Sequence, residues 1–213
     1  MEPGRSPAQL IAESEGLLLD FDGPVCNVYA GSDPARTASE LAAAYNLDIN
    51  TDDPLQLITY ALATNGPVDD IHRALTRTEI EAVRTATETP GIRALIETYH
   101  GPIAIVSNNA SEAIENWLTH NGLRPSVDDI TGRDPQHMKP DPAPLLTAAE
   151  ALGVPVDRCV FVGDSLNDAR AAARAGTALV ALANKPSKLR LFMDEGCDAI
   201  VEGIDQLVPL VRE

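Results

Sequence analysis

The sequence has few aromatic side chains and no long apolar runs. Phe, Trp and Tyr make up 4% of its 213 residues, so a packed core has to be built mainly from Ala, Val, Leu and Ile. Hydrophobic residues still reach 44%, which is too many for a disordered chain. No apolar run approaches the roughly 18 residues that a membrane span requires, and the first residues lack the layout of a secretory signal. We therefore expect a globular, cytoplasmic protein that contacts no membrane.

Cysteine is also scarce. Cys26, Cys159 and Cys197 are scattered along the chain, and no two of them form a C-x-x-C pair. An odd number of unclustered cysteines argues against a disulfide framework and against a zinc site. We expect the three thiols to be buried or spare.

Basic residues are few for a chain with this many acids. Lys and Arg number 16 and Asp and Glu number 32, for a formal net charge of −16. Such a surface repels nucleic acid and anionic lipid, so we expect neither as a partner. If the protein binds an anionic ligand, the few basic residues that contact it, and any metal ion, would have to lie inside the binding site.

Short apolar runs bounded by turn-forming residues predict buried strands. They are Gly16–Asp22, Pro102–Ser107, Cys159–Asp164 and Thr177–Ala183, with Val127–Thr131 and Asp198–Val201 as weaker candidates. Runs that are apolar at every position suit a parallel sheet covered on both faces. Helical patterns lie between them, at Ala110–Asn121, at Pro142–Leu152 with Asp141 as N-cap, and at Ser165–Ala175. The alternation predicts an α/β fold with a doubly wound parallel sheet.

Residues 25–89 interrupt this alternation. They contain no convincing strand and read as helices at Pro34–Asn46, Pro54–Thr64 and Asp69–Thr87. Thr89, Pro90 and Gly91 then mark a turn before the next core helix. We interpret 25–89 as an all-helical insertion, which leaves 1–24 and 90–213 as the core.

Polar residues of related chemistry end three of the predicted strands. In an open α/β sheet, ligands bind beyond the carboxyl ends of the strands, so these residues can converge. An Asp at a strand end is also a common turn or cap residue, and the segments carry weight only together. The candidates are Asp20, Asp22, Ser107, Asn108, Asn109, Asp164 and Asp168, with Lys139 in a loop before a helix.

This set suits phosphoryl transfer. Crowded carboxylates need a cation, and Mg²⁺ binds through a few carboxylates and water. An Asp such as Asp20 can attack phosphorus and form an aspartyl-phosphate. Lys139 and the Ser107 hydroxyl can stabilise the charge on the transferred group. A second carboxyl, Asp22, can protonate the leaving oxygen and later activate water.

Four segments resemble the signatures of the haloacid dehalogenase superfamily, in particular its phosphoglycolate phosphatase-like members. They are LLLDFDGPV (17–25), IVSNN (105–109), KPDPAPL (139–145) and VFVGDSLNDARAAARAG (160–176), and the match spans nearly the whole chain. The resemblance implies a Rossmann-like core with a small helical cap at 25–89. It also implies an Mg²⁺-dependent phosphohydrolase that acts on a small phosphorylated metabolite.

The resemblance also implies roles for individual residues. Asp20 would be the nucleophile and a metal ligand, and Asp22 the general acid and base, with its backbone carbonyl on the metal. Ser107 and the Asn108 backbone would hold the phosphoryl group, which Lys139 would neutralise. Asp164 would bind Mg²⁺, and Asp168 would support it directly or through water. Pro24 and Asn27 depart from the family pattern, at positions that concern the cap more than the phosphoryl chemistry.

Three other functions are compatible with parts of this pattern. Dehalogenases lack the second Asp and use no metal, so Asp22 and the segment 163–168 count against that branch. A phosphosugar mutase similar to β-phosphoglucomutase would use the same residues, and a non-catalytic phospho-ligand-binding protein could keep the fold. Substrate choice is expected to lie in the cap, with Asn27, Tyr29, Arg36 and His72 as candidate contacts. The motifs specify neither the substrate nor the oligomeric state.

Overall fold

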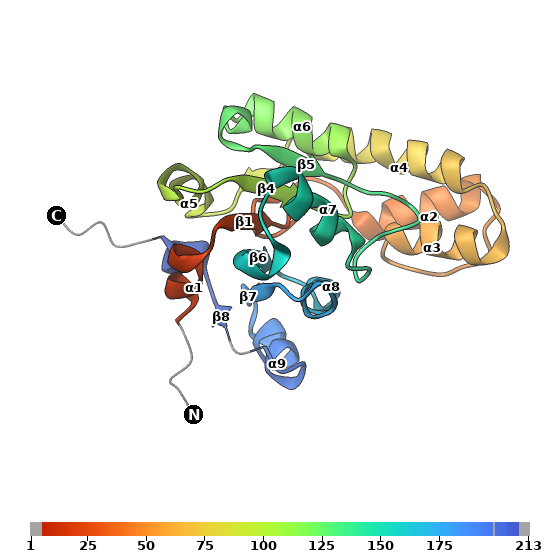
Figure 1. Ribbon diagram of the computed structural model, residues 1–213. Coiled ribbons are helices and arrows are strands. Elements are labelled where there is room, and N and C mark those ends of the chain that lie inside the picture. Colours follow the sequence, from red (N-terminus) through yellow and green to blue (C-terminus); the bar gives the residue numbers. More distant parts are fainter. Residues whose placement is uncertain (1–5, 198, 209–213) are drawn as a thin grey trace.

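The computed structural model describes residues 6–197 and 199–208, and its centre is a parallel sheet (Figure 1). The strand order is β5-β4-β1-β6-β7-β8, and every pairing between neighbours is parallel. The strands are Gly16–Leu19 (β1), Ile103–Val106 (β4), Asp129–Thr131 (β5), Cys159–Gly163 (β6), Ala178–Leu182 (β7) and Ile200–Val201 (β8). The predicted doubly wound α/β fold is confirmed. Asp198, the predicted start of the last strand, lies outside the described residues.

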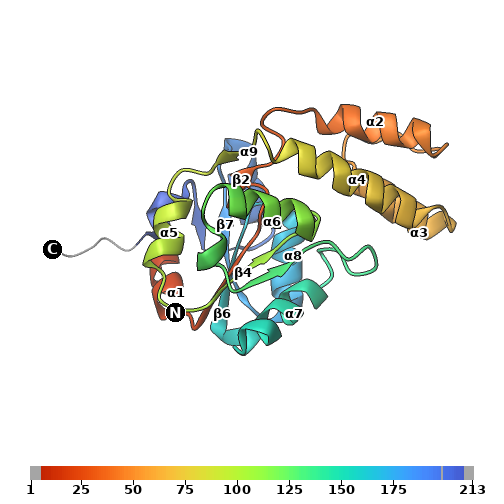
Figure 2. The same cartoon turned by 90° about the horizontal axis from the view of Figure 1, so that it is seen from above.

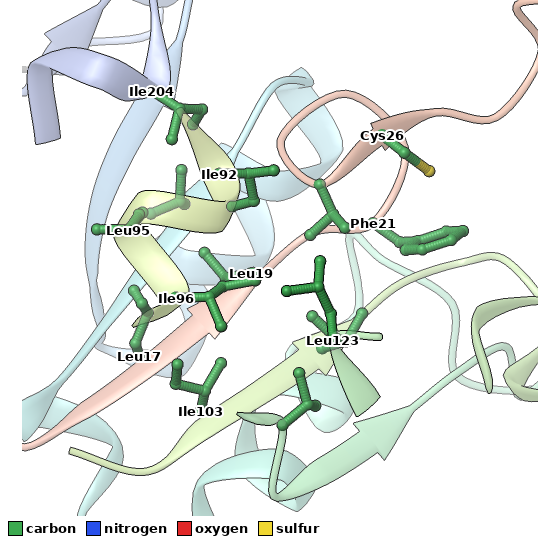
Figure 3. Packing of buried hydrophobic residues seen from close by; sticks show 14 of the residues in the cluster. Leu17, Leu19, Phe21, Cys26, Ile92, Leu95, Ile96, Ile103, Leu123 and Ile204 are labelled. Atoms are coloured by element: carbon green, nitrogen blue, oxygen red, sulfur yellow. The ribbon is translucent and has the colours of Figure 1, made fainter. Parts of the chain in front are cut away.

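The sheet is buried on both faces, as its uniformly apolar strands predict. Leu17 and Leu19 of β1 pack on one face with α5 (Ile92–Thr98), as Figure 3 shows, whereas Leu18 belongs to the cluster on the opposite face. Because successive side chains of a strand point to opposite faces, a strand covered on both sides must be apolar at each position.

Helices cover both faces of the sheet. The helices α1 (Pro7–Glu13), α5 and α6 (Ser111–His120) share the core of Leu17 and Leu19. The opposite face is covered by α7 (Ala143–Leu152) and α8 (Leu166–Ala175), and α9 (Pro186–Asp194) packs beside α8. Short 3₁₀ turns occur at Arg124–Ser126, Val156–Arg158 and Ile204–Leu207. No helix in the described ranges combines the length and apolarity needed to cross a membrane.

The insertion between β1 and β4 extends beyond the sheet (Figure 2). Its helices are α2 (Pro34–Ala44), α3 (Leu55–Thr64) and α4 (Val68–Ala82). They bury a hydrophobic cluster of their own, which includes Leu57, Ile58 and Leu75. The helical insertion was therefore predicted correctly.

Two details of the insertion differ from the prediction. Its ends pair as a short antiparallel ribbon, β2 (Cys26–Asn27) with β3 (Thr87–Glu88), where no strand was predicted. The last helix ends at Ala82 instead of Thr87, because the chain after it turns to reach β3. Strands this short carry no periodic pattern, and only the return of the chain to the core makes them pair.

Candidate active site

The carboxyl end of the sheet borders a cavity of about 420 Å³. Every residue assigned to the site from the sequence lines it: Asp20, Asp22, Ser107, Asn108, Lys139, Asp164 and Asp168. These residues follow β1, β4 and β6, or lie in the first turn of α8 and in the loop before α7. Parallel strands end at a common edge, so segments far apart in the sequence surround one hollow.

Asp20 directly follows β1, and its neighbours hold it in place. Its backbone N–H donates to the carbonyl oxygen of Val162 in β6, at 2.9 Å. Phe21 is buried edge-on against Trp117 of α6, with ring centroids 5.7 Å apart. The Phe21 N–H donates to Asp20 Oδ1 at 2.7 Å. Only 7% of Asp20 is exposed, so its carboxylate has a defined position in the lining of the cavity.

Lys139 supplies the positive charge beside Asp20. Its Nζ lies 2.9 Å from Asp20 Oδ1 and 2.6 Å from Asp168 Oδ1, and it donates to the carbonyl oxygen of Val106 at 3.0 Å. The Phe161 ring centroid is 5.1 Å from the same nitrogen. Buried charges need partners of this kind to offset their desolvation. One ammonium group therefore orients two carboxylates.

The electrostatics of this group favour an additional cation. Burial, and then the charge of Asp168, raise the pKa of Asp20 well above its ordinary value, against the opposing effect of Lys139. Burial alone would raise the pKa of Asp168, but Lys139 and Ser165 hold it below its ordinary value. Burial also raises the pKa of Asp164. A bound cation would lower the pKa of Asp20 and so favour its ionised form.

The donor set fits a hard divalent cation. Asp20, Asp164 and Asp168 each offer a carboxylate oxygen, and these oxygens lie within 4.8 Å of one another. Oxygen ligands of this kind, supplemented by water, are those that Mg²⁺ prefers. Asp168 also accepts hydrogen bonds from the Asp164 N–H at 3.1 Å and the Ser165 hydroxyl at 2.6 Å, so it fixes the turn that carries Asp164.

Asp22 is placed by a turn and not by the strand. The strand predicted over Gly16–Asp22 ends at Leu19, so the alternation of side chains along a strand does not extend to Asp22. Its Oδ1 accepts from the Val28 N–H at 2.9 Å, and burial raises its pKa to about 6. Gly23 has φ of +106°, and a Cβ there would lie 2.3 Å from Asp164 Oδ2. The turn therefore requires glycine.

The loop after β4 is tied to the lysine loop. The Asn108 side chain accepts from the Lys139 N–H at 2.8 Å and donates to the Lys139 carbonyl oxygen at 3.0 Å. Ser107 Oγ accepts from the Asn109 N–H at 3.2 Å and is 3.1 Å from Asn109 Oδ1. Ser107 and Lys139 therefore keep a fixed relation on one wall of the cavity.

Two residues that support this loop were missed in the sequence. Arg133 Nη1 donates to Glu79 Oε1 at 2.6 Å, and both side chains are fully buried. Glu79 also accepts from Asn109 Nδ2 and from the Ala110 N–H, each at 3.0 Å. A signal was present: Glu79 follows Leu75 by four residues on the buried stripe of α4, where an apolar residue is expected.

The candidate cap contacts have different positions. Tyr29 lines the site cavity, whereas Asn27 lines a neighbouring one. Arg36 is exposed and pairs with Glu40 at 2.6 Å. His72 Nδ1 accepts a hydrogen bond from Arg133 Nε at 3.1 Å, so its role is structural. Among these four, only Tyr29 borders the site.

A family model described as haloacid dehalogenase-like hydrolase matches residues 15–176. The chain therefore belongs to the haloacid dehalogenase-like hydrolases, a family of enzymes. It is 28% identical to the fructose-1-phosphate phosphatase YqaB of Escherichia coli K12, over 76% of this chain and 92% of that one. It is 26% identical to the phosphoglycolate phosphatase of Escherichia coli O157:H7, over 91% of each. The crystal structure of CbbY from Rhodobacter sphaeroides with phosphate has a TM-score of 0.71 at 25% identity, covering 91% of this chain and 96% of that one.

Proposed function

We propose that this protein is an Mg²⁺-dependent phosphatase that hydrolyses a monophosphate ester of a small metabolite, with Asp20 as nucleophile. One observation carries the proposal: the buried Asp20 carboxylate lines the cavity, 2.9 Å from Lys139 Nζ and beside two further carboxylates. Membership of the hydrolase family and the two phosphatase relatives support it.

The reaction would use these residues in two steps. An oxygen of Asp20 attacks phosphorus while the bond to the leaving oxygen breaks, and Asp22 donates a proton to that oxygen. A water then attacks the phosphorus of the aspartyl-phosphate and gives its proton to Asp22. The bond between phosphorus and the Asp20 oxygen breaks, so phosphate is released and Asp20 is restored. Lys139, the Ser107 hydroxyl and the Asn108 backbone would offset the charge on the phosphoryl oxygens.

Asp20, Asp164 and the Asp22 carbonyl would hold Mg²⁺, and Asp168 would support them. The ion would offset the charge of the carboxylates and of the phosphoryl group. We assign 1–24 and 90–213 to the catalytic core and 25–89 to the cap, which would contact the leaving group.

Removal of the metal tests this proposal. We expect phosphate release from a panel of phosphorylated metabolites with Mg²⁺, none after EDTA treatment, and recovery when Mg²⁺ is added back. Binding should also stabilise the fold, by about 2.7 kcal/mol at a concentration 100 times the dissociation constant. Turnover that is unaffected by EDTA would rule out the metal. Conversion of a sugar phosphate to its isomer, without phosphate release, would identify a mutase.

Lys188 should compete with the metal for Asp164. Its ammonium group pairs with Asp164 Oδ2, a carboxylate that we assign to Mg²⁺. We expect Lys188→Met to tighten Mg²⁺ binding about tenfold, because it removes one positive charge beside the site. Isothermal titration calorimetry with Mg²⁺ measures this directly. Lys185→Met is the matched control. Lys185 and Lys188 line the same cavity, which neighbours the site cavity, but Lys188 forms the ion pair with Asp164. Unchanged affinity in Lys188→Met would contradict the assignment of Asp164.

A further inference from the structure

The wall of the site cavity that the insertion provides is acidic and apolar. It consists of Tyr29, Pro34, Asp52, Asp53, Pro54 and Leu55. Among the described residues that line the whole cavity, Lys139 alone is basic, and it lies on the core side. A leaving group that points toward the insertion therefore meets two carboxylates and no cation.

The core side has no positive charge to spare. Lys139 is shared by Asp20 and Asp168, and Lys188 is paired with Asp164. When Asp22 carries the proton that it donates in the proposed reaction, the three carboxylates Asp20, Asp164 and Asp168 exceed these two ammonium groups by one charge. A divalent cation then leaves one positive charge, which is less than the negative charge of the phosphoryl group. A second anionic group on the substrate would find nothing in the cavity to neutralise it.

Other basic residues near the cavity are engaged elsewhere. The Arg133 side chain is fully buried against Glu79. Arg36 is exposed, pairs with Glu40 and borders a separate surface hollow. Lys185 and Lys188 line the neighbouring cavity, which also contains acidic residues: Glu88, Glu202 and Asp205. These basic residues therefore do not neutralise the carboxylates in the wall that the insertion provides.

Of the two cap carboxylates, Asp53 has a defined position. Asp53 is half-buried before α3, and its Oδ1 accepts from the Leu55 N–H at 2.9 Å. Asp52 is exposed beside it. Carboxylates placed in this way can accept hydrogen bonds from hydroxyl or ammonium groups and repel a carboxylate or a second phosphate. The cavity of about 420 Å³ lies toward the small end of the roughly 300–1,000 Å³ usual for ligand sites.

We infer that the substrate is a monophosphate ester of a small alcohol whose remaining groups are neutral or cationic, such as hydroxyls or an amine, and that Asp52 and Asp53 exclude esters with a second anionic group. This inference rests on the proposed phosphatase function. It separates the chain from a phosphoglycolate phosphatase, because phosphoglycolate carries a carboxylate.

Three phosphate esters of two-carbon alcohols provide the test. Phosphoglycolate ends in a carboxylate, 2-hydroxyethyl phosphate in a hydroxyl and phosphoethanolamine in an ammonium group. With saturating Mg²⁺, we expect kcat/KM for phosphoglycolate to be at least about tenfold lower than for the other two. Added salt should narrow the difference. Phosphoglycolate turnover equal to or better than that of the other esters would overturn the inference and leave the phosphatase function standing.

Variants assign the discrimination to the cap. Asp52→Asn/Asp53→Asn should reduce the preference several-fold, and the amide oxygen at position 53 can still accept from the Leu55 N–H. Asp48→Asn/Asp69→Asn removes an equal charge from exposed positions of the insertion outside the cavity lining and should leave the preference unchanged. An unchanged preference in the double variant would also overturn the inference.

Binding separates failure of the inference from failure of the proposed function. Asp20→Asn cannot form the aspartyl-phosphate, so it allows binding of the three esters to be measured without turnover. We expect phosphoglycolate to bind most weakly, with the largest dissociation constant. If no ester is hydrolysed by the parent protein but this order holds, the phosphatase function fails and the charge selection stands. The reverse order of binding would overturn the charge selection.

Discussion

Glu79→Ala should lower the free energy of unfolding by about 3–5 kcal/mol, the range for breaking a buried ion pair by removing one partner. Arg133 would keep its charge in a site where both side chains are fully buried. The Asn109 side chain and the Ala110 N–H would each lose their hydrogen bond to Glu79. Unsatisfied buried groups add to the loss. Urea denaturation of the metal-free proteins measures the difference.

An exposed pair on the same segment provides the control. Arg84 Nη1 lies 3.3 Å from Glu81 Oε2, and the two side chains are 73% and 70% exposed. We expect Glu81→Ala to change stability by no more than about 1 kcal/mol, because exposed ion pairs contribute little. Glu79→Ala/Arg133→Met should recover part of the stability lost in Glu79→Ala, since it removes the uncompensated charge. Equal losses of unfolding free energy in Glu79→Ala and Glu81→Ala would show that the buried ion pair contributes no more to stability than the exposed one.

Glu79→Ala should also weaken phosphate binding. Glu79 holds the loop that carries Ser107 and Asn108, through Asn109 and Ala110. Release of that loop should raise the inhibition constant of inorganic phosphate. Glu81→Ala should leave it unchanged, since Glu81 pairs with Arg84 at the surface.

Asp20→Asn should reduce kcat by at least about a thousandfold, because the amide cannot form the aspartyl-phosphate. Phosphate release under single-turnover conditions with Mg²⁺ measures the loss. Asp157→Asn is the matched control, since Asp157 is exposed beside the start of β6, at the end of the sheet away from the cavity. Full activity in Asp20→Asn would show that another residue is the nucleophile.

Stability measurements show whether Asp20→Asn is folded. The pKa of Asp20 is raised in the folded protein, first by burial and then by Asp168. A raised carboxyl pKa contributes stability below the unfolded value of about 3.9, and this contribution is lost as pH rises through the folded value. The raised pKa of Asp20 therefore lowers the stability of the metal-free protein at neutral pH, relative to acidic pH. We expect metal-free Asp20→Asn to melt no lower than the parent, while its stabilisation by Mg²⁺ is reduced.

Local sequence patterns determined the sheet and the core of the site. Short runs that are apolar at every position, separated by helical patterns, indicate parallel strands in an α/β fold. The carboxyl ends of such strands lie at one edge of the sheet. The positions of Asp20, Ser107, Asp164 and Lys139 around one cavity follow from that topology. The helical insertion was predictable for a similar reason, because helical periodicity needs only neighbouring residues.

Only the tertiary structure determined which charges pair and which remain free. Glu79 and Arg133 are 54 positions apart, and their contact depends on how α4 returns to the core. The positions of Lys188 on Asp164, and of Asp52 and Asp53 in the wall of the cavity, depend on the packing of loops in the same way. A local pattern reports the periodic burial of apolar side chains. The partner of a buried charge is set by the path of the whole chain, because its low-dielectric surroundings can come from any segment.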